Sequence, residues 1–278
     1  MRTRRPAQAR TQALLRTILA ASLGLACALG YRGVTSVEAE FSLDEIDAIR
    51  IDLPDTPISV LGDPLATSLE VEGAWYSVGG SASVAANNTT APQFFFAREG
   101  RFAELSAVIP VASADLVDLE LGGVTLPPDL DLELWTGVGD IEVAQVEGNI
   151  SVDIEAGRVT IFGGAKGIAV RTGAGDVEIE TTGNTSVTTG RGDVRISQLG
   201  AGGNELVITT HYGSIEATLR SDANLSLDLR ASGDIRVQTR TVSTVSQGSF
   251  VRQVGNGNVR IQLDARGGDI RVRLDETL

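Results

Sequence analysis

Five aspartates stand in the same local setting, and they are the residues of this chain best placed to act together chemically. Each directly follows a glycine and precedes a β-branched residue; they are Asp140, Asp176, Asp193, Asp234 and Asp269. Aligned carboxylates could hold Ca²⁺, an ion that takes about six to eight oxygen ligands. One carboxylate per unit is few for that ion, and calcium-binding nonapeptide repeats place a residue between the glycine and the aspartate. We therefore interpret the five as turn residues, with a calcium ladder as the weaker alternative.

One of these aspartates completes Arg191-Gly192-Asp193, the tripeptide that animal adhesion receptors read. Its arginine occupies a position that Val138 and Ala174 fill in neighbouring copies of the same pattern. The glycine and the aspartate are the parts that these copies share. The tripeptide is therefore interpreted as one copy of a structural repeat and not as an adhesion motif.

Groups that could carry catalysis are scarce. His211 is the only histidine of the chain, and it has no recognisable nucleophile motif beside it, as a Ser-His-Asp triad requires. Asp153 and Asp228 share a repeat position but lie several units apart, which is too far for a glycosidase pair. The only cysteine is Cys27, so the body of the protein has no disulfide and no thiolate metal site. We predict no catalytic residue and no cofactor.

The aspartates belong to an internal repeat, which is the strongest signal in the sequence. Its clear copies are "TGVGDIEV", "TGAGDVEI", "TGRGDVRI", "ASGDIRV" and "RGGDIRV", and its weaker copies are "EAGRVTI", "HYGSIEA" and "GNGNVRI". The central glycines stand at 139, 157, 175, 192, 213, 233, 257 and 268, so the steps are 18, 18, 17, 21, 20, 24 and 11 residues. Each unit reads as strand, glycine turn, strand. The short last step is interpreted as a terminal hairpin or capping strand.

The strands of the repeat alternate with period two, which gives each one an apolar and a polar face. We expect these residues to point inward: Ile141, Val143, Ile150, Val152, Ile154, Val159, Ile161, Val177, Ile179, Val194, Ile196, Leu225, Leu227, Leu229, Ile235 and Val237. We expect one outward row to contain Glu142, Thr160, Glu178, Arg195, Glu216, Arg236, Arg260 and Arg271. If units stack in register, Arg195, Glu216 and Arg236 alternate in sign along that row.

A narrow strand pair cannot bury its apolar face alone, so stacked units must share one core. The prediction is an all-β protein, a β-solenoid with an N-terminal β cap. An antiparallel meander or sandwich is the alternative, because period-two patterning suits both. Three glycosylation-like sequons, at Asn149, Asn184 and Asn224, fall in one repeat position, so they are interpreted as strand starts.

The chain before the repeats is less regular, and we divide it into residues 1–30, a cap over 31–135 and an array over 136–278. "IRIDLPDTPISVLGD" and "TSLEVEGAW" alternate like strands, and "GGSASVAANNTTAP" is expected to be a loop. Four phenylalanines gather at Phe94, Phe95, Phe96 and Phe102. They are interpreted as packing of the cap, with a binding patch as the alternative.

Residues 1–30 combine five arginines with an apolar run that is too short for a permanent membrane helix, which needs about 20 residues. A signal peptide is predicted, and with it export to the periplasm or the cell surface. "LGLAC" resembles a bacterial lipobox, which would make Cys27 the site of a lipid anchor. Ordinary cleavage near Ala26-Cys27-Ala28 is the alternative, and Cys27 is then one small residue of the apolar run.

The net charge of the chain limits the kinds of partner that it can bind. Removal of residues 1–30 changes the formal net charge from −13 to −18, with 18 basic against 36 acidic side chains. A surface this negative repels phosphate backbones, so we predict no nucleic-acid partner. Cations and polar or neutral partners remain compatible with it.

The opening strands "IRIDLPDTPISV", the step "LPPDLDLELWTGVGDIEV" and the serial "TGxGDVxI" units resemble the bacterial putative-adhesin repeat family over about residues 41–274. The resemblance implies an extended β-repeat fold on exported or membrane-attached proteins, and it brings no catalytic residues. We therefore expect a non-enzymatic adhesin or scaffold that presents a polar β surface to an envelope polymer or a protein partner. A carbohydrate-active β-helix enzyme and a periplasmic accessory or sensing domain are the alternatives.

Overall fold

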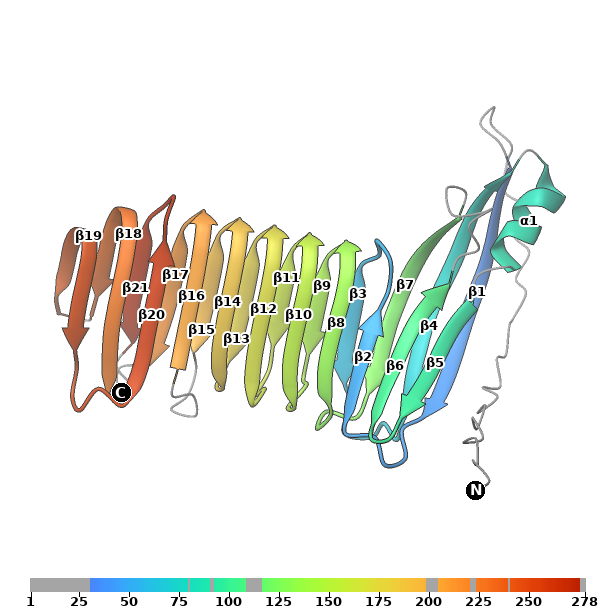
Figure 1. The fold of residues 1–278 in the computed structure, drawn as a ribbon, viewed down its shortest axis with the longest axis horizontal. Coiled ribbons are helices and arrows are strands. Elements are labelled where there is room, and N and C mark those ends of the chain that lie inside the picture. The colour runs from blue at the N-terminus through green and yellow to red at the C-terminus, as the bar shows by residue number, and fades with distance from the viewer. Residues whose placement is uncertain are drawn as a thin grey trace, which may run out of the picture.

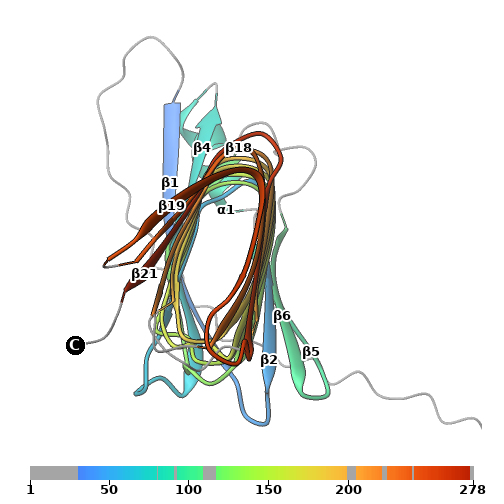
Figure 2. The same cartoon turned by 90° about the vertical axis from the view of Figure 1, so that its left-hand side faces the viewer.

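The computed structural model describes residues 31–79, 81–90, 93–108, 117–198, 205–220, 224–239 and 241–275. Two ladders of strands run side by side along the molecule and enclose one narrow apolar core (Figure 1 and, viewed end-on, Figure 2). The signal peptide expected over residues 1–30 and the lipid anchor at Cys27 lie outside the described residues. Within those residues, no helix is long and apolar enough to cross a membrane.

The first ladder forms the surface that we call face A. Its strands, in spatial order, are β6 (Phe102–Val108), β2 (Ala48–Asp52), β8 (Asp131–Val138), β10 (Asn149–Ala156), β12 (Gly167–Ala174), β14 (Asn184–Arg191), β16 (Glu205–Tyr212), β20 (Val259–Ala265) and β18 (Leu225–Gln238). Neighbouring strands in this ladder are parallel.

The second ladder forms face B. Its strands, in spatial order, are β7 (Val117–Leu126), β3 (Ile58–Gly62), β9 (Ile141–Ala144), β11 (Val159–Phe162), β13 (Val177–Thr181), β15 (Val194–Gln198), β17 (Ile215–Arg220), β21 (Ile270–Asp275) and the second half of β18. These strands are also parallel, so each coil contributes one strand to each face. Parallel stacking of coils makes the protein a β-solenoid and excludes the antiparallel meander.

Period-two alternation decides what enters the core. All sixteen residues that the sequence places inward, from Ile141 to Val237, are at most 2% exposed. Thr172, Thr189 and Thr210 also point inward, at the strand end beside the corner. The inward residues expected from the sequence do not include these threonines, because the alternation of apolar residues does not mark them.

The coils at the C-terminal end do not follow the order of the sequence. β20 lies between β16 and β18, and β21 lies between β17 and β18. The expected terminal hairpin or capping strand at the last, 11-residue step is therefore wrong, because β20 and β21 form a complete coil. The strand that ends the stack is β19 (Ser243–Gln253), which pairs antiparallel with β18.

This order also corrects the outward row. The partner of Glu216 in the next coil is Arg271 and not Arg236, so the alternation of charge continues to Arg271. It ends there, because Arg271 adjoins a second arginine, Arg236. Arg260 lies on face A beside Glu205, and its assignment to the row on face B is wrong. The error follows from counting Gly257 as a corner, although the corner of this coil is Gly267-Gly268.

A second coil at the N-terminal end is inserted out of order. β2 and β3 pair with β8 and β9 on one side and with β6 and β7 on the other. Antiparallel strands then widen this end: β4 (Ser68–Gly79) on β7, β1 (Tyr31–Ser42) on β4, and β5 (Gln93–Glu99) on β6. Figure 1 shows these strands splayed away from the regular stack.

The segment expected to be a loop at residues 79–92 contains helix α1 (Ala82–Thr90). The hydroxyl of Ser81 accepts a hydrogen bond from the Val84 N–H at 3.3 Å and caps the first turn. Ala85 is fully buried, and Gly33 and Gly79 in the strands below have no side chain to block the helix backbone. Small residues with no apolar periodicity conceal this helix in the sequence.

Three of the four phenylalanines pack within the cap. Phe94 is buried 5.6 Å from the Trp75 ring, and Phe96 stacks on Phe41 at 4.7 Å between ring centroids. Phe102 is half-buried at the edge of face A, whereas Phe95 is exposed. Packing of the cap therefore explains most of this cluster.

Candidate functional site

The corner between the two faces is built from stacked glycines. Gly139, Gly157, Gly175, Gly192 and Gly213 have φ between +139° and +155°, a region that residues with side chains rarely adopt. A Cβ on any of the last four would lie closer than 3.0 Å to the carbonyl oxygen of the preceding glycine in this row. The close approach of successive coils therefore requires glycine at this corner.

The recurring aspartates connect one coil to the next. The Oδ1 atom of Asp140 accepts the Arg158 N–H at 2.8 Å, Asp176 accepts the Asp193 N–H at 2.9 Å, and Asp193 accepts the Ser214 N–H at 2.8 Å. At the C-terminal end Asp269 accepts the Asp234 N–H at 2.9 Å. We expected each aspartate to bond its own turn, and the bond instead reaches the same position in the neighbouring coil. In this row one oxygen of the carboxylate is already occupied by the fold.

The row of corner aspartates offers few free oxygen ligands for Ca²⁺. Arg158 and Ser214 occupy the same position in two of the coils, so the carboxylates are not continuous. Among the described residues, no group of three or more His, Cys, Asp or Glu side chains is placed to hold a metal ion. The geometry thus favours the turn role of the five aspartates.

The Arg-Gly-Asp tripeptide lies at this corner. The Arg191 guanidinium lies 5.9 Å from the centre of the Tyr212 ring in the next coil, and the Asp193 carboxylate holds Ser214. The two side chains therefore stabilise coil stacking, as the repeat interpretation of the tripeptide requires.

His211 and the two aspartates considered for hydrolysis do not converge. His211 lies at the end of β16, where Nδ1 is 3.4 Å from the Thr189 carbonyl and Nε2 is 3.3 Å from the Arg266 guanidinium. Asp153 aligns with Arg171 in the ladder of face A, and Asp228 aligns with Gln262. The three sequon asparagines all mark strand starts, but they do not all align in the ladder. Asn224 lies two residues before the position of its strand that aligns with Asn149 and Asn184.

Face A contains a cluster that the sequence did not point to. Arg50 of β2 lies between Phe102 of β6 and Trp135 of β8, with its guanidinium carbon 5.7 Å and 5.8 Å from the two ring centres. The same guanidinium donates to Glu133 Oε2 at 2.6 Å and 2.9 Å. Cation–π contacts and two charge-assisted hydrogen bonds to one carboxylate oxygen fix the arginine and orient both rings. We call Arg50, Phe102, Glu133 and Trp135 the tryptophan platform.

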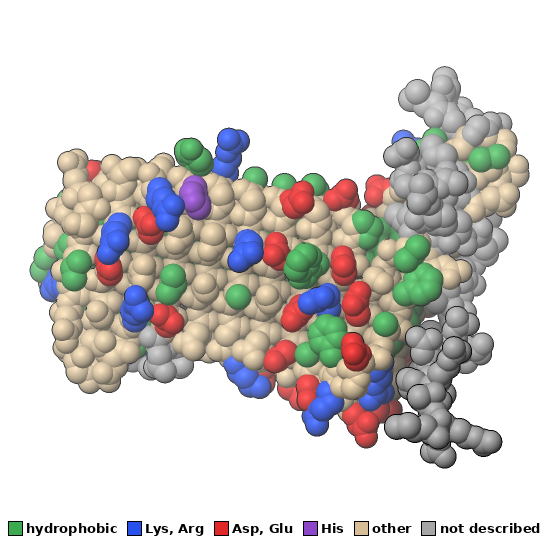
Figure 3. Space-filling view, in the orientation of Figure 1, with side chains coloured by type: hydrophobic (Ala, Val, Ile, Leu, Met, Phe, Trp, Pro, Cys, Tyr) green, Lys and Arg blue, Asp and Glu red, His purple; other side chains and the backbone are tan. Residues whose placement is uncertain are grey.

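The indole of Trp135 remains 47% exposed, which is unusual for so large an apolar side chain. Asp52 and Asp153 are its neighbours in the two adjacent strands. About half of this large side chain is thus available at the surface, between carboxylates that can accept hydrogen bonds. Figure 3 shows hydrophobic, basic and acidic side chains gathered over the N-terminal part of this face.

A shallow groove continues from the platform across β10, β12, β14 and β16. Its floor consists of small residues, among them Ser151, Gly167, Ala169 and Ser186, because these occupy successive outward positions of the ladder. Larger side chains stand around it, namely Asp131 and Glu133 at one end and Glu205 at the other. Figure 3 shows few hydrophobic or charged side chains over the middle of this face.

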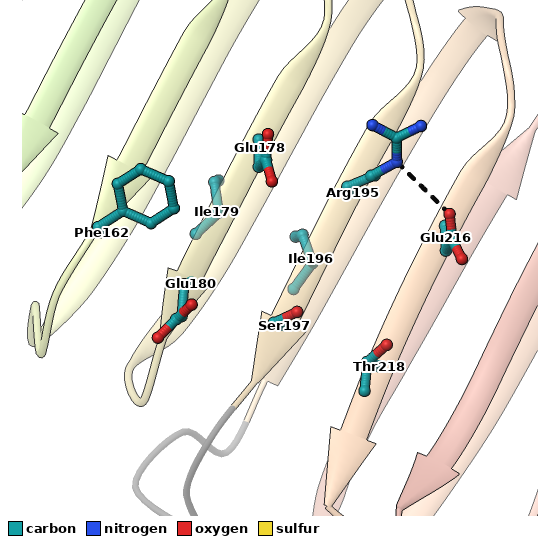
Figure 4. Close-up of a pocket in the computed structure, with 9 residues that line it drawn as sticks. All are labelled: Phe162, Glu178, Ile179, Glu180, Arg195, Ile196, Ser197, Glu216 and Thr218. Carbon is teal, nitrogen blue, oxygen red and sulfur yellow. Dashed lines mark ion pairs between the residues drawn. The ribbon is translucent and has the colours of Figure 1, made fainter.

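Face B carries a smaller depression over β11, β13, β15 and β17 (Figure 4). Glu178, Arg195 and Glu216 form its upper row, and the Arg195 Nε lies 3.5 Å from the Glu216 carboxylate. Phe162 closes one end. Glu178, Glu180 and Glu216 against the single Arg195 leave the lining of this depression net negative.

Two contacts within the cap shift the pKa values of the groups that they join. The hydrogen bond from Arg101 lowers the pKa of the exposed Asp47 carboxyl, and the same contact raises the pKa of Arg101. The hydrogen bond with Glu120 raises the pKa of the Tyr76 phenol. These pairs join strands or turns of the cap, and their location gives no indication of acid–base catalysis.

Two stacked parallel ladders, glycine corners and a capped end define a class of β-solenoid proteins. The sequence model of the Toastrack DUF4097 family matches residues 80–273, and the chain belongs to this family. A search of curated proteins gives no match.

Two solved structures match this chain at low similarity. A putative cell adhesion protein from Clostridium sporogenes has 11% identity and a TM-score of 0.33, and the alignment covers 89% of this chain and 100% of that one. A putative adhesin from Bacteroides fragilis has 12% identity and a TM-score of 0.40, with coverage of 86% and 97%. At these values neither likeness carries an argument about function.

Proposed function

We propose that this protein is a non-enzymatic scaffold of the cell envelope that binds a neutral polysaccharide chain along face A. The observation that carries the proposal is the exposed ring of Trp135, which Arg50 holds in place. The ring lies two residues along β8 from Glu133, which lines one end of the small-residue groove. A rigid, amphipathic aromatic ring is a favourable anchor for a ligand, since little side-chain entropy is lost on binding.

The chemistry around the ring suits a sugar. The axial C–H groups of a pyranose can pack on the indole face, while its hydroxyls donate to the carboxylates of Asp52 and Asp153. Farther along the groove, Ser151 and Ser186 offer hydroxyls at the floor. Coils repeat at about 4.8 Å, so a chain lying across them meets similar polar groups at regular intervals. The net charge of −13 disfavours anionic polymers.

The proposal keeps the protein non-enzymatic because the acids of face A are spread along the ladder. Asp131, Glu133 and Glu205 stand at opposite ends of the groove, and Glu133 is engaged by Arg50. Binding without turnover is the expected behaviour. Incubation with each bound polysaccharide should release no new reducing ends, whereas their release would favour the carbohydrate-active alternative.

The binding test is pull-down and titration with neutral polysaccharides of defined linkage, such as β-glucan, xylan and mannan. Trp135→Ala should weaken binding by at least about tenfold, and Trp135→Phe should retain part of it because a ring remains. Phe162→Ala, an exposed ring on face B, is the matched control. Equal binding by wild type and Trp135→Ala, or no binding to any of these polymers, would contradict the proposal.

We further propose that the chain is exported and held at a membrane through a lipid on Cys27. Cells that carry a C-terminal tag are treated with protease before and after the outer membrane is opened, beside the Cys27→Ser variant. Release from the membrane only in that variant supports the anchor. Unchanged partitioning removes it, and accessibility of the tag in intact cells distinguishes the cell surface from the periplasm.

A further inference from the structure

Strand β19 ends the stack with an unpaired edge. Among the described strands it pairs with β18 alone, so its second edge presents backbone N–H and C=O groups to solvent. Figure 2 shows it at the end of the solenoid nearest the viewer. Such an edge is a template for another strand unless charges, prolines or a covering segment protect it.

The side chains of β19 offer little of that protection. Its outward residues are uncharged throughout, in the order Ser243, Val245, Gln247, Ser249, Val251 and Gln253. Val245 is 60% exposed and Val251 is 77% exposed. Arg252 is the only charged residue of the strand.

The other strands that pair on one side only are different. β1 carries Arg32, Glu38 and Glu40, and β5 carries Arg98 and Glu99. Charges of this kind disfavour edge-to-edge pairing. In a chain with a net charge of −13, the uncharged outward face of β19 therefore singles out this edge.

We infer that β19 joins two copies of this chain by antiparallel pairing about Gly248. Two-fold pairing centred on this residue sets Val245 of one copy opposite Val251 of the other, and the reverse. The same register sets Ser243 opposite Gln253 and Gln247 opposite Ser249. The strand is thus complementary to itself, as a two-fold interface requires, and no like charges oppose each other.

The backbone at the centre agrees with this arrangement. Gly248 has φ +79° and lies where β18 carries two extra residues, between Ala231 and Asp234. A Cβ built on Gly248 would meet no atom within 4 Å, so the space beside it is open to a second backbone. The resulting dimer has both caps at its outer ends and its two stacks joined by one strand pair.

The first test is sedimentation equilibrium of the purified full chain over a wide concentration range. A reversible monomer–dimer equilibrium is expected, and Val245→Lys or Val251→Lys should each raise its Kd by more than about tenfold with an unchanged circular dichroism spectrum. Val34→Lys, at an exposed valine of the β1 edge, is the control and should leave Kd unchanged. The inference is overturned if the wild type stays monomeric at every concentration. It is also overturned if the wild type forms oligomers larger than a dimer and Val34→Lys abolishes them.

A second test fixes the register in the Cys27→Ser background. A mixture of Val245→Cys and Val251→Cys molecules should form covalent heterodimers on mild oxidation, because the two positions are opposed across the interface. Each variant alone should form at least several-fold less covalent dimer than the mixture. Equal yields in the mixture and in the separate variants would contradict pairing about Gly248.

Discussion

The glycine corner provides the sharpest test of how the coils stack. In Gly175→Ala the added Cβ meets the Gly157 carbonyl oxygen closer than 3.0 Å, and the residue must keep φ near +141° or move the corner. A residue with a side chain in such a region costs about 1–3 kcal/mol. Overpacking against backbone that cannot turn away costs about 1–3 kcal/mol more. Together these effects should lower the free energy of unfolding by about 2–6 kcal/mol.

The assay is denaturant unfolding followed by far-ultraviolet circular dichroism, which reports on all coils. Gly164→Ala is the matched control, because a Cβ there meets no atom within 4 Å and the residue has no positive φ. Repeat proteins can unfold in stages, so the midpoints of the first transitions are compared. If Gly175→Ala costs no more than Gly164→Ala, the corner is not packed as described.

Three further substitutions test other parts of the stack. Thr189→Val should raise the free energy of unfolding by about 1 kcal/mol in the same assay, because the buried Thr189 hydroxyl has no hydrogen-bond partner and β10 has isoleucine in this position; a loss of stability would show that the hydroxyl is satisfied. Arg195→Glu should lower the free energy of unfolding by about 0.5–1 kcal/mol, and by less at high salt, because glutamates adjoin residue 195 on both sides. An effect that does not depend on salt would point to packing instead. Asp47→Asn should destabilise the cap at neutral pH and not at strongly acidic pH, because the Arg101 contact lowers the pKa of Asp47 and its contribution is lost as pH falls through that value; an equal effect at both pH values, measured by acid titration, would contradict it.

The composition of the core could be predicted from the sequence because alternation depends only on local spacing. Ile141 or Leu229 points inward whichever coil lies beside it, and the solenoid places both in the core. The order of the coils could not be predicted in the same way. An even shift of register keeps every side chain on its face, so Asn224 can move two residues out of step without an apolar residue being exposed.

The position of β20 and β21 inside the stack, before β18, has a physical reason that can be recognised once the structure is known. Both strands have an apolar residue at every second position, such as Ile261 and Val272, and are buried between neighbours on each side. No residue of β19 is buried, which suits the end of the stack. The sequence contained the signal in "VRIQLDARGGDIRV", which is a complete strand–glycine–strand unit.

The tryptophan platform was missed for a different reason. Arg50, Phe102 and Trp135 come from three strands that are distant in the sequence and adjacent only because β2 is inserted between β6 and β8. Alternation in "DLELWTGV" places Trp135 outward, which was the one available signal. Its partners depend on the order of the coils.

The order of the coils is the central claim, because both the platform and the free edge of β19 depend on such insertions. Disulfide trapping in the Cys27→Ser background tests it directly at the C-terminal end. Arg260 lies between Glu205 and Ser226, so the latter two are about two strand spacings, or ~9.6 Å, apart. A disulfide requires Cα atoms within about 7 Å. The structure predicts rapid trapping of Glu205→Cys with Arg260→Cys and none of Glu205→Cys with Ser226→Cys; the reverse result would mean that the coils stack in sequence order.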